Sequence, residues 1–217
     1  MKKLAALLAL SLIILSSTDI NAQMATKGIK GGGNASSLYV DGSADYGFLF
    51  DFHAGVFFRT APIERFSLQL ELLYSRQGAS LEVEQSFSSY SGEQIRLNYI
   101  SLPVMARINF LNNKAGLLIG PSINYLAGVG DDGDIEGSGE DLRGLYNDFD
   151  FTLNLGWEYD VSSGVLVGAR GSIGLSDIMS GDNVIVESPA APNPIPYLTD
   201  NRGITNVVLQ IYVGLIF

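Results

Sequence analysis

The sequence contains no cysteine, so no disulfide bond contributes to the stability of this chain. It has 13 Lys and Arg residues against 23 Asp and Glu, and no basic stripe, which argues against nucleic-acid binding. With one histidine and no cysteine, a zinc site of the usual ligand types is not expected, and no cofactor is predicted. Beyond the first residues the chain has no apolar run of 18 residues, so no helical membrane anchor is predicted.

The N-terminal segment has the pattern of an export signal. Lys2 and Lys3 precede an apolar run of 12 residues that ends at Leu15, and a small, polar stretch follows to Ala22. This run is shorter than the roughly 20 residues that a helix needs to cross a bilayer, so cleavage after Ala22 is the better interpretation. We therefore predict a signal peptide over 1–22 and one domain over 23–217, which has 11 basic and 22 acidic residues.

Most of the remaining sequence alternates between apolar and polar residues, as strands with two unlike faces do. In the last segment every second residue from Val207 to Phe217 is apolar. Seven further segments follow the same pattern, the first of them weakly. The eight predicted strands cover about 27–36, 47–59, 66–79, 95–110, 114–127, 148–159, 164–176 and 206–217. Pro103 and Pro121 fall inside two of them and predict bulges or non-pairing positions there.

The connections between these segments alternate in length. Three short ones, at about 60–65, 111–113 and 160–163, separate longer ones, and bacterial outer-membrane barrels have short periplasmic turns and longer external loops. The longer connections are at about 37–46, 80–94, 128–147 and 177–204. With both chain ends on the periplasmic side, every short connection falls inside. The prediction is an all-β fold, an eight-stranded antiparallel up-and-down transmembrane β-barrel.

Aromatic residues lie near both ends of the apolar strand faces. Those near the predicted periplasmic ends are Phe58, Phe66, Phe110, Trp157, Tyr159 and Phe217, and those near the other ends are Phe48, Tyr74, Tyr125 and Phe149. The ten residues from Phe48 to Phe58 span roughly 33 Å at about 3.3 Å each. A strand tilt of about 40° reduces this to roughly 25 Å, the height of the apolar band between two aromatic girdles.

Alternation alone does not decide which face points outward. A soluble lipocalin-like binding barrel would point its apolar face inward, but the export signal, the final Phe217, the girdles and the loop lengths favour the membrane interpretation. The narrow lumen would then hold a polar network, predicted to consist of Asp51, His53, Arg59, Glu71, Arg107, Asp150, Glu158 and Arg170. Buried charges have to pair, and Glu71 and Arg107 on adjacent strands are the expected partners.

Four segments together resemble the PorT-like outer-membrane β-barrel family of Bacteroidetes-type bacteria. They are Gly28–Asn34, Leu68–Ala79 with its Glu-Leu-x-Tyr-Ser-x-x-Gly pattern, Leu97–Arg107 with its Tyr-x-x-x-Pro pattern, and Gly120-Pro121. The resemblance spans about 24–217 and implies the barrel. The founding member of that family is linked to protein secretion across the outer membrane. Ser101 stands where relatives often have an acidic residue, so pairing around Arg107 is expected to differ.

Two features of the sequence could carry chemistry. His53 shares a strand face with Asp51, but it lies near mid-strand, where substrates hardly reach, so we predict a hydrogen-bonding role and no enzyme. The acidic segment with the calcium candidates Asp131, Asp132, Asp134 and Glu136 does not match the spacing of a twelve-residue calcium loop. A solvated acidic loop is expected there, with cations bridging it to anionic lipid as the alternative.

The function predicted from the sequence is that of a structural or interaction platform with external loops in a Gram-negative outer membrane. A small-solute channel, opposed by the narrow lumen of eight strands, and an accessory of protein secretion are the alternatives. The expected partners are outer-membrane lipid, envelope or secretion proteins, and the barrel-assembly machinery through the final strand that ends at Phe217.

Overall fold

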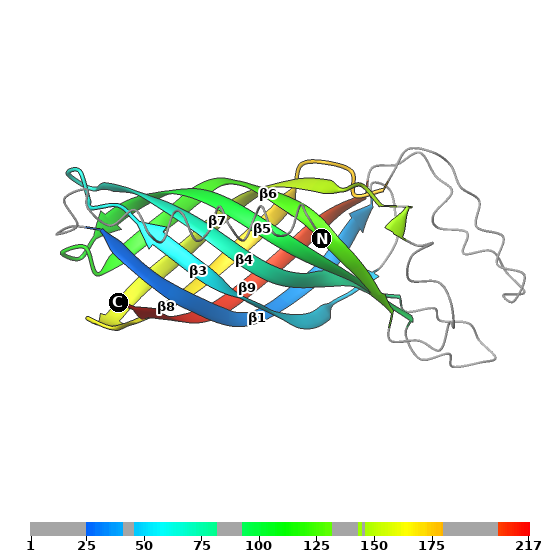
Figure 1. Cartoon of the computed structure of the whole chain (residues 1–217), viewed down its shortest axis with the longest axis horizontal. Coiled ribbons are helices and arrows are strands. Elements are labelled where there is room, and N and C mark those ends of the chain that lie inside the picture. Colours follow the sequence, from blue (N-terminus) through cyan, green and yellow to red (C-terminus); the bar gives the residue numbers. More distant parts are fainter. Residues whose placement is uncertain (1–24, 41–45, 82–92, 132–142, 145, 180–203) are drawn as a thin grey trace, which may run out of the picture.

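The computed structural model describes residues 25–40, 46–81, 93–131, 143–144, 146–179 and 204–217. The strands are β1 (Thr26–Val40), β2 (Tyr46–Gly47), β3 (Leu49–Arg59), β4 (Phe66–Leu81), β5 (Glu93–Phe110), β6 (Ala115–Asp131), β7 (Phe149–Ser162), β8 (Val165–Gly174) and β9 (Ile204–Ile216). Each of the eight predicted segments corresponds to one long strand (Figure 1), and the short β2 precedes β3 and, like β3, pairs with β4. The described residues include no helix that is both long and apolar enough to span a bilayer.

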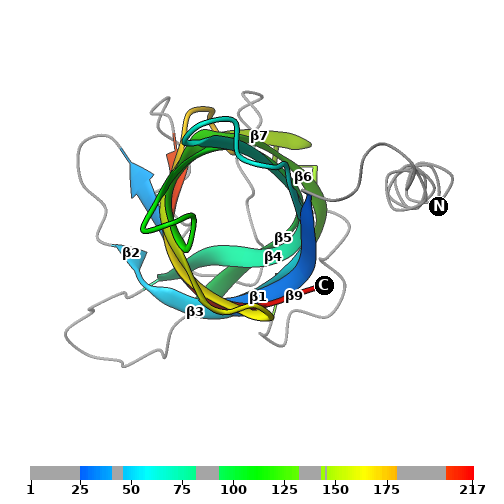
Figure 2. The same ribbon diagram turned by 90° about the vertical axis from the view of Figure 1, so that its left-hand side faces the viewer.

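The strands form one closed antiparallel wall. Their order is β2-β4-β3-β1-β9-β8-β7-β6-β5, and pairing of β4 with β5 completes the circle. Figure 2 shows the resulting ring in a view along the barrel. The first and last strands pair over a long register from Gly28↔Ile216 to Val40↔Ile204. The Phe217 N–H also donates a hydrogen bond to the Lys27 carbonyl, at 2.9 Å. The predicted eight-stranded up-and-down barrel is confirmed.

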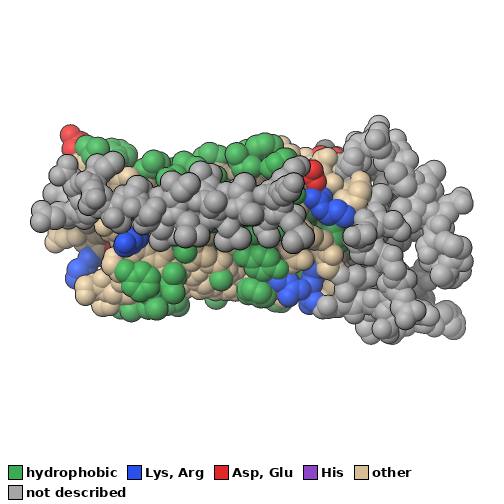
Figure 3. All heavy atoms as spheres, in the orientation of Figure 1, with side chains coloured by type: hydrophobic (Ala, Val, Ile, Leu, Met, Phe, Trp, Pro, Cys, Tyr) green, Lys and Arg blue, Asp and Glu red, His purple; other side chains and the backbone are tan. Residues whose placement is uncertain are grey.

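The apolar faces of the strands point outward. Phe50 is 76% exposed, Ile211 71% and Leu155 62%, and these residues come from three different strands. Along each strand the residues that alternate with these exposed ones point inward, and most of the buried ones are polar. Figure 3 shows hydrophobic side chains along the length of the outer wall. The alternative of a lipocalin-like barrel with an apolar interior is therefore wrong for the middle of this molecule, because the apolar side chains there lie on the outer surface.

Each of the two strand prolines coincides with a local gap in the ladder. Pairing of β4 with β5 omits two residue pairs between Leu70↔Val104 and Leu73↔Ser101, where Pro103 lies. Pairing of β5 with β6 omits two pairs between Pro103↔Ser122 and Ala106↔Ile119, where Pro121 lies. Proline has no N–H to donate, so these gaps are its direct effect. Elsewhere, β5 and β6 shift register by one residue after Asn98.

A second irregularity interrupts the pairing of β3 with β4. The ladder runs from Arg59↔Gln69 to His53↔Ser75, and it resumes through β2 at Gly47↔Ser80. Between these two pairs the β2–β3 segment has one residue more than β4, as in a β-bulge. Side chains of β1 cross the gap: Asn34 Nδ2 donates to the carbonyls of Phe52 and Arg76. Similarly, Ser36 Oγ accepts a hydrogen bond from the Gly78 N–H.

The short turns lie at the same end of the barrel as Phe217. At this end the Asp160 N–H donates to the Lys114 carbonyl, and the Ile216 N–H donates to the Gly164 carbonyl. The turn after β5 contains three successive left-handed residues, Leu111, Asn112 and Asn113, with φ of 52°, 55° and 66°. Asparagine tolerates this conformation better than most residues. This turn lies at the short connection predicted at about 111–113.

Candidate functional site

The centre of the barrel holds a network of buried ionic groups. Glu71 of β4 is its middle member and is 2% exposed. Arg170 of β8 binds its carboxylate in a bidentate manner, with Nη1–Oε2 and Nη2–Oε1 distances of 2.8 and 2.7 Å. Lys30 Nζ of β1 donates to Glu71 Oε1 at 2.6 Å. Three strands from opposite sides of the ring thus meet at one carboxylate, which is feasible because the lumen of an eight-stranded barrel is only as wide as its side chains.

A second carboxylate, Glu158 of β7, lies beside the first toward the short turns. Its Oε2 accepts a hydrogen bond from Arg59 Nη2 at 2.8 Å, and Lys30 Nζ lies 3.5 Å from its Oε1. Arg59 Nη1 also binds Asp160 at 3.0 Å, near the end of the barrel. Gln69 joins the two centres, because its Nε2 donates to Glu71 at 2.7 Å and to Glu158 at 3.0 Å. The result is one continuous chain of contacts.

An aromatic side chain covers the cations of this network. The Tyr212 hydroxyl donates to Glu158 Oε1 at 3.1 Å, while Lys30 Nζ lies 4.4 Å from the centre of the Tyr212 ring. Gly168 on the neighbouring strand makes room for that ring, since a Cβ atom there would lie 2.5 Å from it. His53, 1% exposed, contacts Tyr212 edge-on at 5.8 Å between ring centroids. Its Nδ1 lies 2.7 Å from Asn34 Oδ1, so one ring nitrogen has a hydrogen-bond partner in the lumen.

The one pairing predicted within the network does not form, and two of its eight predicted residues, Asp51 and Asp150, lie apart from the ion network. Arg107 does not pair with Glu71: its Nη1 donates to Asn109, and the nearest carboxylate oxygen is Glu158 Oε2, 4.0 Å from its Nε. Proximity along adjacent strands was a poor guide, because contacts across the lumen compete with contacts between neighbours. Asp51 lies outside the network, with Arg76 and Arg96 each placing Nε 3.4 Å from its Oδ2.

Toward the other end of the barrel the lumenal side chains become neutral. Ser122, Thr152, Asn154 and Ser172 form a hydrogen-bonded group across β6, β7 and β8. Beyond this group lies Asp150, which is 1% exposed. It accepts hydrogen bonds from Ser176 Oγ at 2.9 Å and from Asn206 Nδ2 at 3.2 Å, so its carboxylate has neutral partners.

An apolar cluster, here called the outer cap, fills the lumen at the end opposite the short turns. Its buried members come from five strands and the segment after β8: Leu38, Ala79, Leu97, Tyr99, Leu126, Ile178 and Ile204. Ile178 is 1% exposed although it belongs to no strand. Backbone hydrogen bonds hold it in place, since its N–H donates to the Ile204 carbonyl and its carbonyl accepts from the Asn147 N–H, both at 2.9 Å.

The polarity of the wall inverts at the outer cap. Along β5 the outward residues from Ile100 to Phe110 are mainly apolar, and the inward ones include Arg107 and Ser101. Beyond Ile100 the inward residues are Tyr99 and Leu97, whereas Asn98 and Arg96 lie on the other face. A face that is polar outward and apolar inward suits water. The barrel therefore continues past its apolar band as a short water-facing cylinder with its own hydrophobic core.

The calcium candidates Asp132, Asp134 and Glu136 lie outside the described residues, and only the backbone of Asp131 is described, at the end of β6. Among the described residues no group of three or more His, Cys, Asp or Glu side chains is arranged to hold a metal ion. Three carboxylates, two arginines and a lysine form the described ion network, and each oxygen of Glu71 and Glu158 already has a donor.

Four members of the network were absent from the predicted set: Lys30, Gln69, Asp160 and Tyr212. Lys30 and Tyr212 share strand faces with Asn34 and Gln210, and that alternation was the available signal. Gln69 follows the same rule on β4, two residues before Glu71. The predicted network contains ionisable residues of the clearest strands, whereas in the structure the neutral donors Gln69 and Tyr212 also bind its carboxylates.

Comparison with known proteins supports the barrel. The model of a family described as outer membrane protein beta-barrel domain matches residues 21–180. Comparison with curated proteins gives no significant match. Among solved structures, Neisserial surface protein A is 12% identical, with a TM-score of 0.50 over 89% of this chain and 99% of that one. The attachment invasion locus protein Ail of Yersinia pestis is 11% identical, with a TM-score of 0.46 over 90% of this chain and 100% of that one. Such likeness concerns the fold alone.

Proposed function

The chain belongs to the outer membrane protein beta-barrel domain family, and from this premise we propose that it is a closed, non-conducting platform in the bacterial outer membrane. Its role would be to hold the segments that join its strands at the outer end. The observation that carries this proposal is the filled lumen: an ion network in the middle and the outer cap beyond it.

The filling of the lumen argues against the channel alternative. Glu71 and Glu158 are 2% and 0% exposed, and Leu97, Leu126 and Ile178 of the outer cap are 0–1% exposed. A hydrated ion would have to cross the cap, where the inward side chains offer few polar groups, and then displace ion pairs such as the bidentate one between Glu71 and Arg170. Both steps are costly, so passive conduction is not expected.

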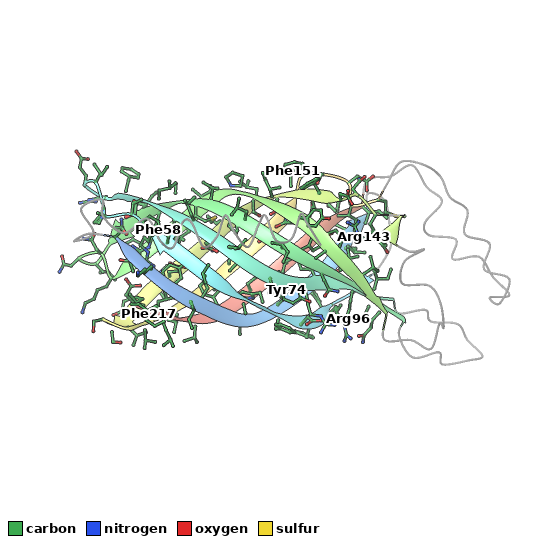
Figure 4. All side chains as sticks on the ribbon, viewed as in Figure 1. Phe58, Tyr74, Arg96, Arg143, Phe151 and Phe217 are labelled. Carbon is green, nitrogen blue, oxygen red and sulfur yellow. The ribbon has the colours of Figure 1, made fainter. Side chains whose placement is uncertain are left out.

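The inversion of polarity supports the platform itself. Strands β4, β5 and β6 continue past the apolar band, and their outer ends share the hydrophobic core of the cap with Leu38 and Ile204. The Arg143 side chain adds a further tie, since Nη2 donates to the Leu126 carbonyl at 2.7 Å. Figure 4 shows Arg143 at this end of the barrel. The connecting segments would therefore begin from a packed rim that stands above the lipid.

We expect the wild-type protein, reconstituted in planar bilayers, to show no unitary current steps in 1 M KCl. As a matched comparison, Leu97→Gly and Tyr99→Gly together would remove two side chains of the cap while the ion network stays. Well-resolved, reproducible steps from the wild type would refute the platform proposal and restore the channel.

The orientation can be tested with single cysteines, because the natural chain has none. Tyr39→Cys lies at the outer end of β1, where the tyrosine is 61% exposed, and Ile63→Cys lies in a short turn, where the isoleucine is 80% exposed. In intact cells a membrane-impermeant maleimide is expected to label position 39, and to label position 63 only after the outer membrane is permeabilised. The reverse pattern would contradict the proposed orientation.

Several finer points belong to the same proposal. The segment 1–22 would be removed on export, and the remaining 23–217 would form the domain. Insertion would proceed through the barrel-assembly machinery acting on the strand that ends at Phe217. No enzymatic role is proposed, because His53 is buried among Asn34 and Tyr212. The PorT-like resemblance of the four sequence segments supports membership in that subgroup, and with it an accessory role in protein secretion as the second candidate.

A further inference from the structure

Two arginines lie on the outer wall near the outer edge of the apolar band. Arg76 follows Tyr74 by two residues on the outward face of β4, and Arg96 is its neighbour on β5, paired with Gly78. Figure 4 labels Tyr74 and Arg96 in this region, and Figure 3 shows basic side chains there beside a hydrophobic patch. No part of the ion network in the lumen involves either arginine.

The two guanidinium groups share one carboxylate. Arg76 Nε and Arg96 Nε are each 3.4 Å from Asp51 Oδ2, and the Asp51 side chain is only 6% exposed. The Arg76 side chain is 27% exposed and lies over the Phe52 ring, 5.7 Å from its centre. Arg76 is thereby held against the wall while part of it faces outward.

The height of the site corresponds to the lipid headgroups. Aromatic side chains gather at the membrane–water interface, and Tyr74 and Phe52 mark its outer level, with ring centroids 6.0 Å apart. Arg76 lies two residues farther along β4, which is about 7 Å of strand. Below it, Phe52 is 46% exposed and offers an apolar surface at the level where acyl chains begin.

We propose that Arg76, with Arg96 beside it, binds the phosphate of an anionic lipid of the outer leaflet, whose acyl part lies along Phe52 and Tyr74. A guanidinium matches phosphate geometry, because its N–H groups can donate two parallel hydrogen bonds. Asp51 Oδ2 lies 3.4 Å from the Nε atom of each arginine and competes with the phosphate for their charge. This inference rests on the proposed outer-membrane orientation, which places this end of the barrel outside.

The test uses the purified full-length barrel in neutral detergent, with the midpoint of thermal unfolding read from its heat-modifiable migration on gels. The probe is bisphosphorylated lipid A, compared with the same lipid after enzymatic dephosphorylation and with inorganic phosphate. At a hundredfold excess over the dissociation constant, bisphosphorylated lipid A is expected to raise the midpoint by about 5–10 °C. The other two probes are expected to raise it by much less.

Substitutions then locate the effect. Arg76→Gln is expected to lose most of the lipid-induced shift, whereas Arg65→Gln, which removes an exposed arginine from a short turn at the opposite end, keeps it. Asp51→Asn removes the competing carboxylate and is expected to enlarge the shift. An unchanged shift in Arg76→Gln, or an equal effect of the dephosphorylated lipid or of inorganic phosphate, would overturn the lipid site. Those results would leave the labelling and conductance experiments unaffected, so the two proposals fail separately.

Discussion

Replacing Glu71 with glutamine is expected to lower the free energy of unfolding by about 3–5 kcal/mol, the usual effect of removing one partner of a buried ion pair. Glutamine has the same shape, so no cavity forms, but the charge that neutralises Lys30 and Arg170 is lost. Both cations are nearly inaccessible to water, with side-chain exposures of 1% each. Neither has a second carboxylate within 3 Å among the described residues.

Urea unfolding in lipid vesicles, followed by the fluorescence of the single tryptophan, Trp157, would measure this loss. Glu64→Gln is the matched control: it removes an exposed carboxylate from a short turn and is expected to change stability by less than about 0.5 kcal/mol. Adding Lys30→Met to Glu71→Gln removes one of the two cations that lose their carboxylate, and it should recover part of the lost free energy of unfolding. A loss below about 1 kcal/mol for Glu71→Gln would show that the network carries little of the stability expected for such pairs.

Replacing Leu153 with arginine is expected to destabilise the barrel by about 2–4 kcal/mol, as arginine does near the middle of a bilayer. Leu153 is 45% exposed on β7, four residues from both Phe149 and Trp157, which mark the two edges of the apolar band. The cost arises from placing the charge in hydrocarbon, since the side chain has room on the outer wall. The same substitution on a water-facing surface would be nearly neutral.

Ile63→Arg supplies the comparison at another depth. Ile63 is 80% exposed, more than Leu153, but it lies in a short turn at the edge of the barrel. Its replacement is expected to cost about 0–1 kcal/mol, because charges near the interface are tolerated. Equal effects of the two substitutions in vesicle unfolding experiments would mean that the wall around Leu153 does not face lipid.

The strands and their faces could be predicted because period-two alternation is a local property. Each long strand contains several inward–outward pairs, so a single exception such as Pro121 did not obscure the pattern. The outer ends of the strands were harder to predict. There the inward residues Leu97 and Tyr99 are apolar and the outward Arg96 is charged, whereas from Ile100 onward the outward face is apolar. The polarity of the two faces changes because the surroundings change from lipid to water.

The ion pairs could be predicted as a set but not partner by partner. The pairing of Glu71 with Arg170 joins β4 to β8, strands that are not neighbours in the ring. Such contacts depend on the stagger of all the strands between them, and one-residue shifts such as those after Asn98 and near Asp160 alter that stagger. The contact of Asp51 with Arg76 lies where the ladder of β3 with β4 is interrupted, and the local pattern does not reveal that interruption.

The pairing of β1 with β9 makes the wall a hoop without a free edge. Peptide connectivity is then only one of the ways in which neighbouring strands are joined, and the hydrogen-bond ladders are the other. A proteolytic cut in a short turn such as 111–114 would therefore leave every ladder in place. The two fragments would be expected to migrate as one particle until a denaturant separated them.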